Sequence, residues 1–582
     1  MNGLTFYGGL YGVVFGNQQF TVRNLTFYNA YTAINQLWDW GWTYSGISVI
    51  NCSIGLNMST GNSAAQSVDS VTLIDSTFTD TPVAILTARN STSLPVAAGS
   101  LILENIGLVN VPVAVQGPQG TVLAGGTTTI TAWGQGHEYT PNGPTSFEGP
   151  IKPNSRPQSL TIREKFYARS KPQYEAVPLL QFVSARTAGA KGDGVTDDTF
   201  ALNILLWTAA AKGQIVFLDA GTYKVTSTIY IPPRSKIVGE SYPVIMGSGS
   251  YFSDINNPQP IICAGSPGEF GVIEWSDTIV STQGATAGAI LIEWNLASPE
   301  GVPSGLWDVH TRIGGFAGSN LQLSQCPPTP WTTDYVDPSC IAAFMSLHIA
   351  PTASGLYLEN NWFWTADHDI EDPLLTQITV FSGRGLYDSS VNGVVWLVGT
   401  AVEHHSLYQY QFANTKNIFA GQIQTETPYF QPNPDATAPF QPLERWNDPD
   451  FHKSCEGVAG NCADAWGLRI VDSQDILIYG GGLYSFFENY STSKSPLPLP
   501  FSLKFKFKAK KNILDCSNQG NGETCQTRIF SIEGSCKDID VYNLNTVGTT
   551  HMITRDGVDV ASYDDNLSGF ADTIALFRID SA

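Results

Sequence analysis

The chain carries little charge, few cysteines and no long apolar run. Only 14% of its 582 residues are charged, and the acidic excess gives a formal net charge of −21. A field of this sign repels nucleic acid, anionic membranes and polyanionic substrates, so we expect a neutral partner, no nucleic acid and no membrane. No apolar stretch approaches the length of a membrane span.

The first residues, MNGLTFY, lack the basic start and the apolar core of a signal peptide. They are typical of the interior of a strand instead. We therefore expect a truncated form, or an incomplete gene product, of a longer extracellular protein.

Nine cysteines are few for this length, but six of them form pairs that are close in the sequence. Short Cys-closed loops in Pro- and Gly-rich surroundings predict the disulfides of a secreted protein. The predicted pairs are Cys326–Cys340, Cys455–Cys462 and Cys516–Cys525. The remaining thiols, interpreted as buried and free, are Cys52, Cys263 and Cys536. Sequons that permit glycosylation begin at Asn24, Asn51, Asn57, Asn90, Asn489 and Asn566.

Glycine and aromatic residues are abundant, which is typical of a large extracellular β protein rich in turns. The segment AGAKGDGVTDDTFALN (188–203) resembles the opening of right-handed parallel β-helix proteins of the pectate-lyase-like superfamily. There it starts the first coil and leads into a capping helix, expected here at 200–211. Because strand-rich sequence precedes it, we predict an all-β fold of two tandem right-handed parallel β-helices. The expected first helix is 1–133, the linker 134–177 and the second helix 178–582.

Repeated segments support a solenoid in the first part of the chain. Each has a polar residue followed by apolar ones, and aligning Asn24, Asn51, Asp75 and Asn105 gives steps of 27, 24 and 30 residues. This spacing is typical of coils that stack on one another. The alternative is a β-sandwich with regular turns.

A Lys-rich stretch at 494–511 differs from everything around it. It is interpreted as a basic strand for a partner, as a solvated loop, or as translated non-coding sequence, because its flanks join naturally without it.

Two glutamates form the candidate catalytic pair. Glu403 and Glu426 are 23 residues apart, about one coil, so both side chains are expected to project from one face as near neighbours. We expect Glu403 and His405 to share a face in the same manner. Two close carboxylates cannot both ionise freely, so one holds a proton and can act as a general acid in glycoside hydrolysis. The alternative is a polar ladder on a solvated face.

Four segments carry a resemblance that covers nearly the whole chain. They are AINQLWDWGW (33–42), LENNWFWTADHD (358–369), EHHSLYQY (403–410) and QTETPYFQP (424–432). These segments resemble those of fungal exo-β-1,3-glucanases of glycoside hydrolase family 55. The resemblance implies a rib-cage-like pair of β-helices with the active site in the cleft between them. It also implies release of glucose from the non-reducing end of β-1,3-glucans such as laminarin, with inversion and without metal or other cofactor.

The resemblance also implies roles for single residues. Glu426 would be the general acid, with Glu403 beside it polarising the site or ordering water. Gln36 and Ser67 would contribute to the water site, Ser67 by a weaker match. The candidate contacts to substrate are Trp38, Trp40, Trp42, Trp362, Trp364, Asp367, His368, His404, His405, Gln424 and Tyr429.

Aromatic rings suit the C–H faces of glucosyl units, although alternating Trp residues also fill cores, and two or three of the five are expected to contact substrate. Asp367, His368, His404 and His405 are interpreted as sugar-contacting or structural rather than as metal ligands.

Rival functions are a polygalacturonase, whose motifs do not occur, and a pectate lyase, which the acidic charge disfavours. A third is a non-catalytic glucan-binding or cell-wall structural β-helix, or an inactive fragment. We expect an extracellular monomer that acts on β-1,3-glucan.

Overall fold

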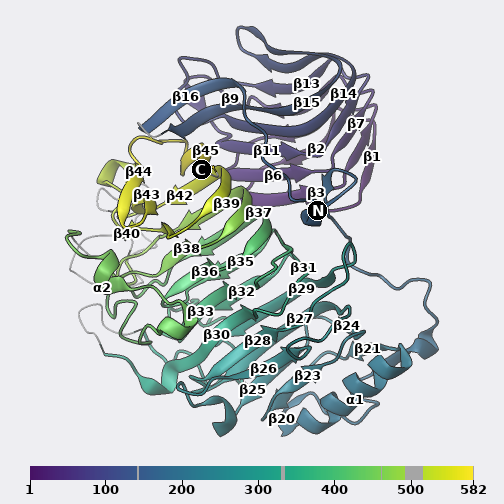
Figure 1. The fold of residues 1–582 in the computed structure, drawn as a ribbon, viewed down its shortest axis with the longest axis vertical. Helices are drawn as coiled ribbons and strands as arrows, with labels where there is room; N and C mark the ends of the chain where they lie inside the picture. Colours follow the sequence, from purple (N-terminus) through teal and green to yellow (C-terminus); the bar gives the residue numbers. More distant parts are fainter. Residues whose placement is uncertain (141–142, 329–334, 460–461, 492–514, 581–582) are drawn as a thin grey trace.

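The computed structural model describes residues 1–140, 143–328, 335–459, 462–491 and 515–580. The Lys-rich stretch at 494–511 lies outside them. Parallel strands in successive coils form two stacks, seen in Figure 1 as the purple and the teal-to-green parts of the ribbon. The prediction of an all-β fold built from parallel solenoids is confirmed. Among the described residues, no helix has the length and apolar character needed to cross a membrane.

The first stack has its own apolar core, which includes Leu25, Phe27, Val49 and Leu103. Its strands are β1 (Thr5–Tyr7), β2 (Tyr11–Phe15), β3 (Gln19–Arg23), β4 (Thr26–Tyr28), β5 (Thr32–Gln36), β6 (Gly41–Ser45), β7 (Ser48–Ile50), β8 (Ile54–Met58), β11 (Ser70–Ile74), β12 (Thr77–Thr79), β13 (Val83–Thr87) and β14 (Ser100–Gly117). The hairpin β9 (Gly61–Asn62) and β10 (Ala65–Gln66) protrudes between β8 and β11.

Antiparallel strands follow the first stack. β14 pairs with β15 (Gly120–Thr140), and β15 pairs with β16 (Gly143–Pro150). These two strands occupy 134–140 and 143–150 of the range that the sequence assigns to the linker. A short hairpin, β17 (Thr161–Ile162) and β18 (Lys165–Phe166), comes next.

Capping helix α1 (Thr199–Lys212) covers the start of the second stack, as the opening segment predicts. The Asp198 carboxylate accepts the backbone N–H groups of Lys191 (2.6 Å) and Gly192 (2.9 Å), which folds the opening segment back on the helix start. The helix ends at Lys212 and is followed by Gly213, whose φ of 69° lies in the left-handed region that glycine adopts most readily.

The second stack continues in two parallel sheets. The first contains β19 (Phe182–Ser184), β20 (Asp193–Asp197), β21 (Ile215–Leu218), β22 (Thr222–Val225), β24 (Lys236–Gly239), β25 (Val244–Ser248), β27 (Glu274–Gln283), β29 (Ser304–Ile313), β31 (Leu356–Glu359), β32 (Trp362–Thr365), β34 (Val395–Val398), β35 (Ala401–Glu403), β37 (Lys416–Glu426), β39 (Gln474–Tyr484) and β42 (Lys537–Val547). The second contains β23 (Ile229–Ile231), β26 (Gln259–Ala264), β28 (Ala289–Trp294), β30 (Ile341–Ile349), β33 (Phe381–Asp388), β36 (Tyr408–Ala413), β38 (Trp466–Val471), β40 (Gln526–Arg528), β41 (Phe530–Glu533) and β43 (Thr549–Arg555), with β44 (Val558–Ser562) antiparallel to β43.

All three predicted disulfides are present, and Cys52, Cys263 and Cys536 are free. Cys52 is buried as expected, whereas Cys263 and Cys536 are partly exposed, so the expectation of burial is wrong for these two. One of these bridges follows the short helix α2 (Phe451–Ser454).

The coil alignment predicted for the first stack is wrong at one position. Asn51 hydrogen-bonds to Asn29, 22 residues earlier, whereas Asn105 bonds to Asp75, 30 residues earlier. Each coil has two corners where Asn or Asp adopts positive φ, and Asn51 belongs to the other corner from Asp75. Both corners favour the same residue types, so composition alone does not separate them.

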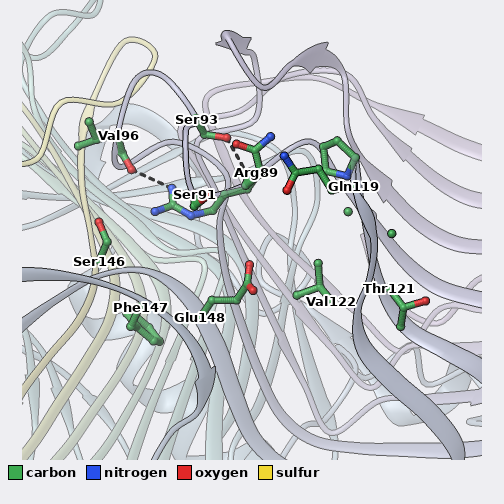
Figure 2. A pocket seen from close by; sticks show the side chains of 14 residues that line it. Arg89, Ser91, Ser93, Val96, Gln119, Thr121, Val122, Ser146, Phe147 and Glu148 are labelled. Atoms are coloured by element: carbon green, nitrogen blue, oxygen red, sulfur yellow. Dashed lines mark hydrogen bonds between the residues drawn. The ribbon is translucent and has the colours of Figure 1, made fainter.

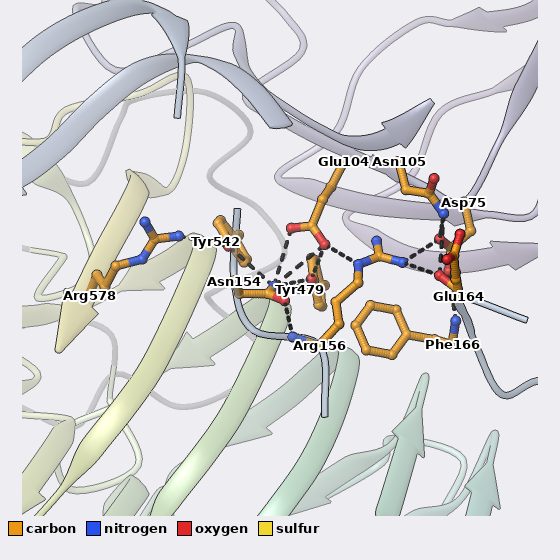
Figure 3. Close-up of polar contacts among 10 residues, drawn as sticks. All are labelled: Asp75, Glu104, Asn105, Asn154, Arg156, Glu164, Phe166, Tyr479, Tyr542 and Arg578. Atoms are coloured by element: carbon orange, nitrogen blue, oxygen red, sulfur yellow. Dashed lines mark hydrogen bonds and ion pairs between the residues drawn. The ribbon is translucent and has the colours of Figure 1, made fainter. Parts of the chain in front are cut away.

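A buried ionic cluster joins the two stacks (Figure 3). Arg156, between the stacks in sequence, donates to Asp75 Oδ1 and Glu104 Oε1, both at 2.6 Å. Tyr479 of β39 donates to the same Glu104 atom at 2.8 Å. The guanidinium lies over the Phe166 ring, 4.5 Å from its centroid. Arg156 therefore compensates two buried carboxylates of the first stack at its seam with the second.

The C-terminal strand β45 (Asp572–Ile579) strengthens this seam. It pairs antiparallel with β42 of the second stack and bridges β15 through Leu576 and Glu138. Strands of both stacks thereby belong to one continuous sheet.

Candidate active site

The two candidate carboxylates lie on adjacent coils. Glu403 ends β35, Glu426 ends β37, and the two residues are register partners in a parallel pair. Neighbouring strands are about 4.8 Å apart, so the side chains leave the sheet side by side. The 23-residue spacing predicted this juxtaposition.

Glu403 is the more deeply buried of the pair, with 7% of its surface exposed. Trp362 Nε1 of the preceding coil donates to its Oε2 at 2.7 Å, and Gln424 also hydrogen-bonds to it. Burial, followed by the negative charge of Glu426, raises the pKa of Glu403 to about 7. Glu403 therefore holds a proton across the mildly acidic range.

Glu426 faces a more open side, and 22% of its side chain is exposed. Its Oε2 accepts the Tyr429 hydroxyl at 2.6 Å and lies 3.5 Å from His404 Nε2. The Tyr429 ring packs edge-on against His404, with centroids 4.6 Å apart. These contacts hold one carboxylate oxygen of Glu426.

His404 is oriented by its other ring nitrogen. Nδ1 lies 3.0 Å from the Thr365 carbonyl, which requires a proton on Nδ1, so Nε2 faces Glu426. Burial alone would lower the pKa of His404, but the Glu426 carboxylate and Asp367 raise it to about 9. The ring therefore supplies positive charge beside the two glutamates.

Trp362 and Trp364 form an aromatic wall next to Glu403. Their rings stack at 5.0 Å with an interplanar angle of 25°, and Trp362 is 41% exposed. Trp364 is buried, and its Nε1 donates to Asp367 Oδ1 at 3.2 Å. The other Asp367 oxygen lies 3.0 Å from His368 Nδ1. An exposed indole above a protonated carboxyl pair suits a sugar ring.

Comparisons with known proteins identify the family of this chain. A family model described as "Rhamnogalacturonase A/epimerase, pectate lyase-like" matches residues 1–57 and 182–266. A Cochliobolus carbonum protein named "Glucan 1,3-beta-glucosidase" is 48% identical over 99% of this chain and 69% of its own length. This relative shows the family of the chain, which belongs to glycoside hydrolase family 55. The resemblance predicted from the four motifs is confirmed.

Family relatives differ in the activity that their names state. An Arthroderma benhamiae protein named "Probable glucan endo-1,3-beta-glucosidase" is 39% identical over 99% of this chain and 73% of its own length.

The solved structure of sacteLam55A from Streptomyces sp. SirexAA-E covers 96% of this chain and 80% of that chain, with 14% identity and a TM-score of 0.39.

His405 is not brought to the two glutamates, and the expectation that it shares a face with Glu403 is wrong. β35 ends at Glu403, and His404 has a φ of 67°, which turns the chain into the coil. The fully buried His405 ring bonds to Ser346 Oγ at 2.7 Å and to Gln409. It has no surface to offer a substrate.

The candidate tryptophans of the first stack lie in different surroundings. Trp42 packs in the core against Phe15 and is 4% exposed, so it is not a substrate platform. Trp40 stacks on Phe570 at 4.7 Å and is 7% exposed. Trp38 is 41% exposed.

The two residues predicted for the water site, Gln36 and Ser67, form hydrogen bonds with groups other than the two glutamates. Gln36 is fully buried, accepts the Tyr44 hydroxyl at 2.5 Å and donates to the Trp38 carbonyl. Ser67 makes backbone hydrogen bonds with Asp39 and Thr60. Within the described ranges, no hydrogen bond or ion pair joins either residue to Glu403 or Glu426.

One neighbour of the site and one buried acid of the first stack were not predicted. Tyr484 of β39 is the register partner of Glu426, lies edge-on to Trp40 at 5.2 Å, and bonds to Gln19. It thereby connects Glu426 to the first stack. Asp39 is fully buried, and one of its oxygens has no hydrogen-bond partner. In the sequence, the position of Asp39 between Trp38 and Trp40 was the feature that could have identified it.

Proposed function

We propose that this chain is a secreted, exo-acting glucanase that releases glucose from the non-reducing end of β-1,3-glucans with inversion. The observation that carries the proposal is the buried Glu403–Glu426 pair beside the exposed Trp362 ring. Family membership supports the β-1,3-glucan substrate, and the three disulfides support secretion.

Glu426 is proposed as the general acid because it is the more exposed carboxyl and lies beside Glu403, which holds a proton up to about pH 7 and can pass it to Glu426. It would protonate the glycosidic oxygen as the bond from that oxygen to the anomeric carbon breaks. A water would attack the anomeric carbon from the opposite face of the sugar and lose its surplus proton to solvent, from which the glutamate pair would be reprotonated for the next cycle. Tyr429 and His404 would hold the carboxylate that remains.

Inversion needs room for water between acid and base, usually about 6.5–9.5 Å between carboxyls. Glu403 and Glu426 leave adjacent strands, so Glu403 is not proposed as the base acting across the sugar ring. We assign it the role of proton holder and polarising group. Gln36 and Ser67 remain proposed contributors to the water site. They would act there only when substrate is bound.

The test is hydrolysis of laminarin followed by proton NMR, with Glu426→Gln beside the wild type. The expected result is prompt α-glucose from the wild type and a loss of about 10²–10⁴-fold in the variant. Glu444→Gln, at an exposed glutamate on the one-turn helix Glu444–Trp446, is the matched control and should retain full activity.

Other outcomes have distinct meanings. Prompt β-glucose would overturn inversion, and oligosaccharides as first products would overturn exo action. A folded wild type that binds laminarin without releasing sugar would identify a non-catalytic glucan-binding protein. Melting curves for all three proteins separate loss of chemistry from loss of fold.

A further inference from the structure

A pocket of about 500 Å³ lies on the first stack, outside the candidate active site (Figure 2). Its walls come from the loop after β13, from the turn between β14 and β15, and from β16. None of the residues assigned above to the candidate active site lines it. The volume falls within the range of about 300–1,000 Å³ typical of small-molecule sites.

Arg89 is the fixed charged group of this pocket. It is 7% exposed, and its Nη1 donates to the carbonyls of Val96 (2.8 Å) and Ala98 (2.6 Å). These two bonds set the plane of the guanidinium. Across the described parts of the chain, no carboxylate comes within ion-pair distance of Arg89. Burial lowers its pKa to about 10, with the charge of Glu148 opposing that shift.

Glu148 of β16 lies on the other side of the pocket from Arg89, as Figure 2 shows. It is exposed, and the two groups act on each other through space without forming an ion pair. The remaining walls carry amide and hydroxyl groups together with four apolar side chains. They include Gln119, Thr121, Ser91, Ser146, Val96 and Val122.

This set of groups selects a neutral, hydroxyl-rich ligand. Because Arg89 and Glu148 carry opposite charges, their fields partly cancel for a ligand with a net charge, so neither an anion nor a cation gains a net attraction. Adjacent sugar hydroxyls can donate to the Glu148 carboxylate and accept from the free guanidinium nitrogens at the same time. Val96 and Val122 offer apolar surface to the C–H face of a sugar.

We propose that this pocket is a second binding site for a neutral oligosaccharide, which holds a β-glucan chain apart from the candidate active site. The choice of glucan rests on the proposed function, whereas the polyhydroxyl class rests on Arg89, Glu148 and the amide and hydroxyl lining. Such a site would keep the protein on a polymer between cleavage events.

The test uses laminaritetraose and calorimetric titration in the Glu426→Gln background, so that the probe is not hydrolysed. The protein is made in an oxidising bacterial strain, so Asn90 of the sequon in the pocket wall carries no glycan. Two binding events are expected. Adding Glu148→Ala should weaken one of them about tenfold, because a charge-assisted hydrogen bond is lost. Glu300→Ala, at an exposed glutamate of the second stack, should change neither.

A single event that survives Glu148→Ala and disappears with Trp362→Ala overturns the second site and leaves the proposed function standing. Tighter binding of tetragalacturonate than of laminaritetraose overturns the neutral ligand class. Conversely, an event sensitive to Glu148→Ala in a protein that never hydrolyses laminarin supports the pocket and overturns the proposed function. On intact enzyme, Glu148→Ala should lower the rate on insoluble glucan while leaving the rate on laminaritetraose unchanged.

Discussion

Replacing Trp362 by phenylalanine separates two roles of this side chain. Phenylalanine keeps an aromatic ring against Trp364, where the indoles now stack at 5.0 Å. It removes the N–H that donates to Glu403 Oε2 at 2.7 Å. This hydrogen bond favours the ionised carboxylate, so its loss must raise the pKa of Glu403 further.

The size of the shift follows from the strength of the bond. A hydrogen bond to a charged group contributes about 1.5–3 kcal/mol, and one pKa unit corresponds to about 1.36 kcal/mol. Loss of the bond should therefore raise the pKa of Glu403 by about 1–2 units from its value of about 7. The carboxyl pair would then keep its proton to distinctly higher pH.

The assay is the pH dependence of kcat/KM on laminaritetraose, which reports the ionisations of the free enzyme. In the proposed mechanism the alkaline fall near pH 7 marks loss of the proton from the pair. In Trp362→Phe this fall should move about 1–2 pH units in the alkaline direction, whatever happens to the absolute rate.

Trp364→Phe is the matched control, because its lost N–H is bonded to Asp367 and not to Glu403. In Trp364→Phe the alkaline fall of kcat/KM should stay close to the pH at which it occurs in the wild type. If the alkaline fall of kcat/KM in Trp362→Phe stays at the wild-type pH, or moves to lower pH, the reasoning that Glu403 sets this ionisation is refuted.

Two further predictions concern stability. Arg156→Met leaves Asp75 and Glu104 buried without their cation and should lower the free energy of unfolding by about 3–5 kcal/mol in urea melts. Lys152→Met removes an exposed ion pair with Asp580 and should cost under about 1 kcal/mol; equal effects would contradict this account of the seam. Burial raises the pKa of Asp388 to about 7, so its contribution to stability is complete below its unfolded pKa and is lost as pH rises through about 7. From about pH 5 to about pH 8 the wild type should lose roughly 2–3 kcal/mol relative to Asp388→Asn, as followed by urea unfolding at each pH. If the wild type and Asp388→Asn lost unfolding free energy equally over this pH range, Asp388 would not be the source of the pH dependence.

Features encoded locally were predictable from the sequence. The opening segment at 188–203 predicted helix α1, because Asp198 and the glycines around it act within a few residues. The disulfides were predictable because short loops leave few pairing choices. The corner residues were not fully predictable, since Asn29 and Asn51 share one corner and Asp75 and Asn105 the other, with the same chemistry at both.

The site was predictable only where one coil separates its members. Glu403 and Glu426 fulfil that condition, and their register follows from it. Tyr484 lies one coil beyond Glu426, but the chain between β37 and β38 makes an excursion of about forty residues, which hides the spacing. His405 was misplaced because period-two alternation assumes extended backbone, and His404 has a φ of 67°.

The chemistry of Glu426 depends on both stacks, although its strand belongs to the second. Strand β39 carries Tyr479 at the ionic seam with Glu104 and, five residues later, Tyr484 beside Glu426. The Tyr484 ring meets Trp40 of the first stack, so one side chain links the first stack to the strand neighbour of Glu426. Burial is the main cause of the raised pKa of Glu403. We therefore expect the packing that joins the two stacks to support the carboxyl pair on which the proposed catalysis depends.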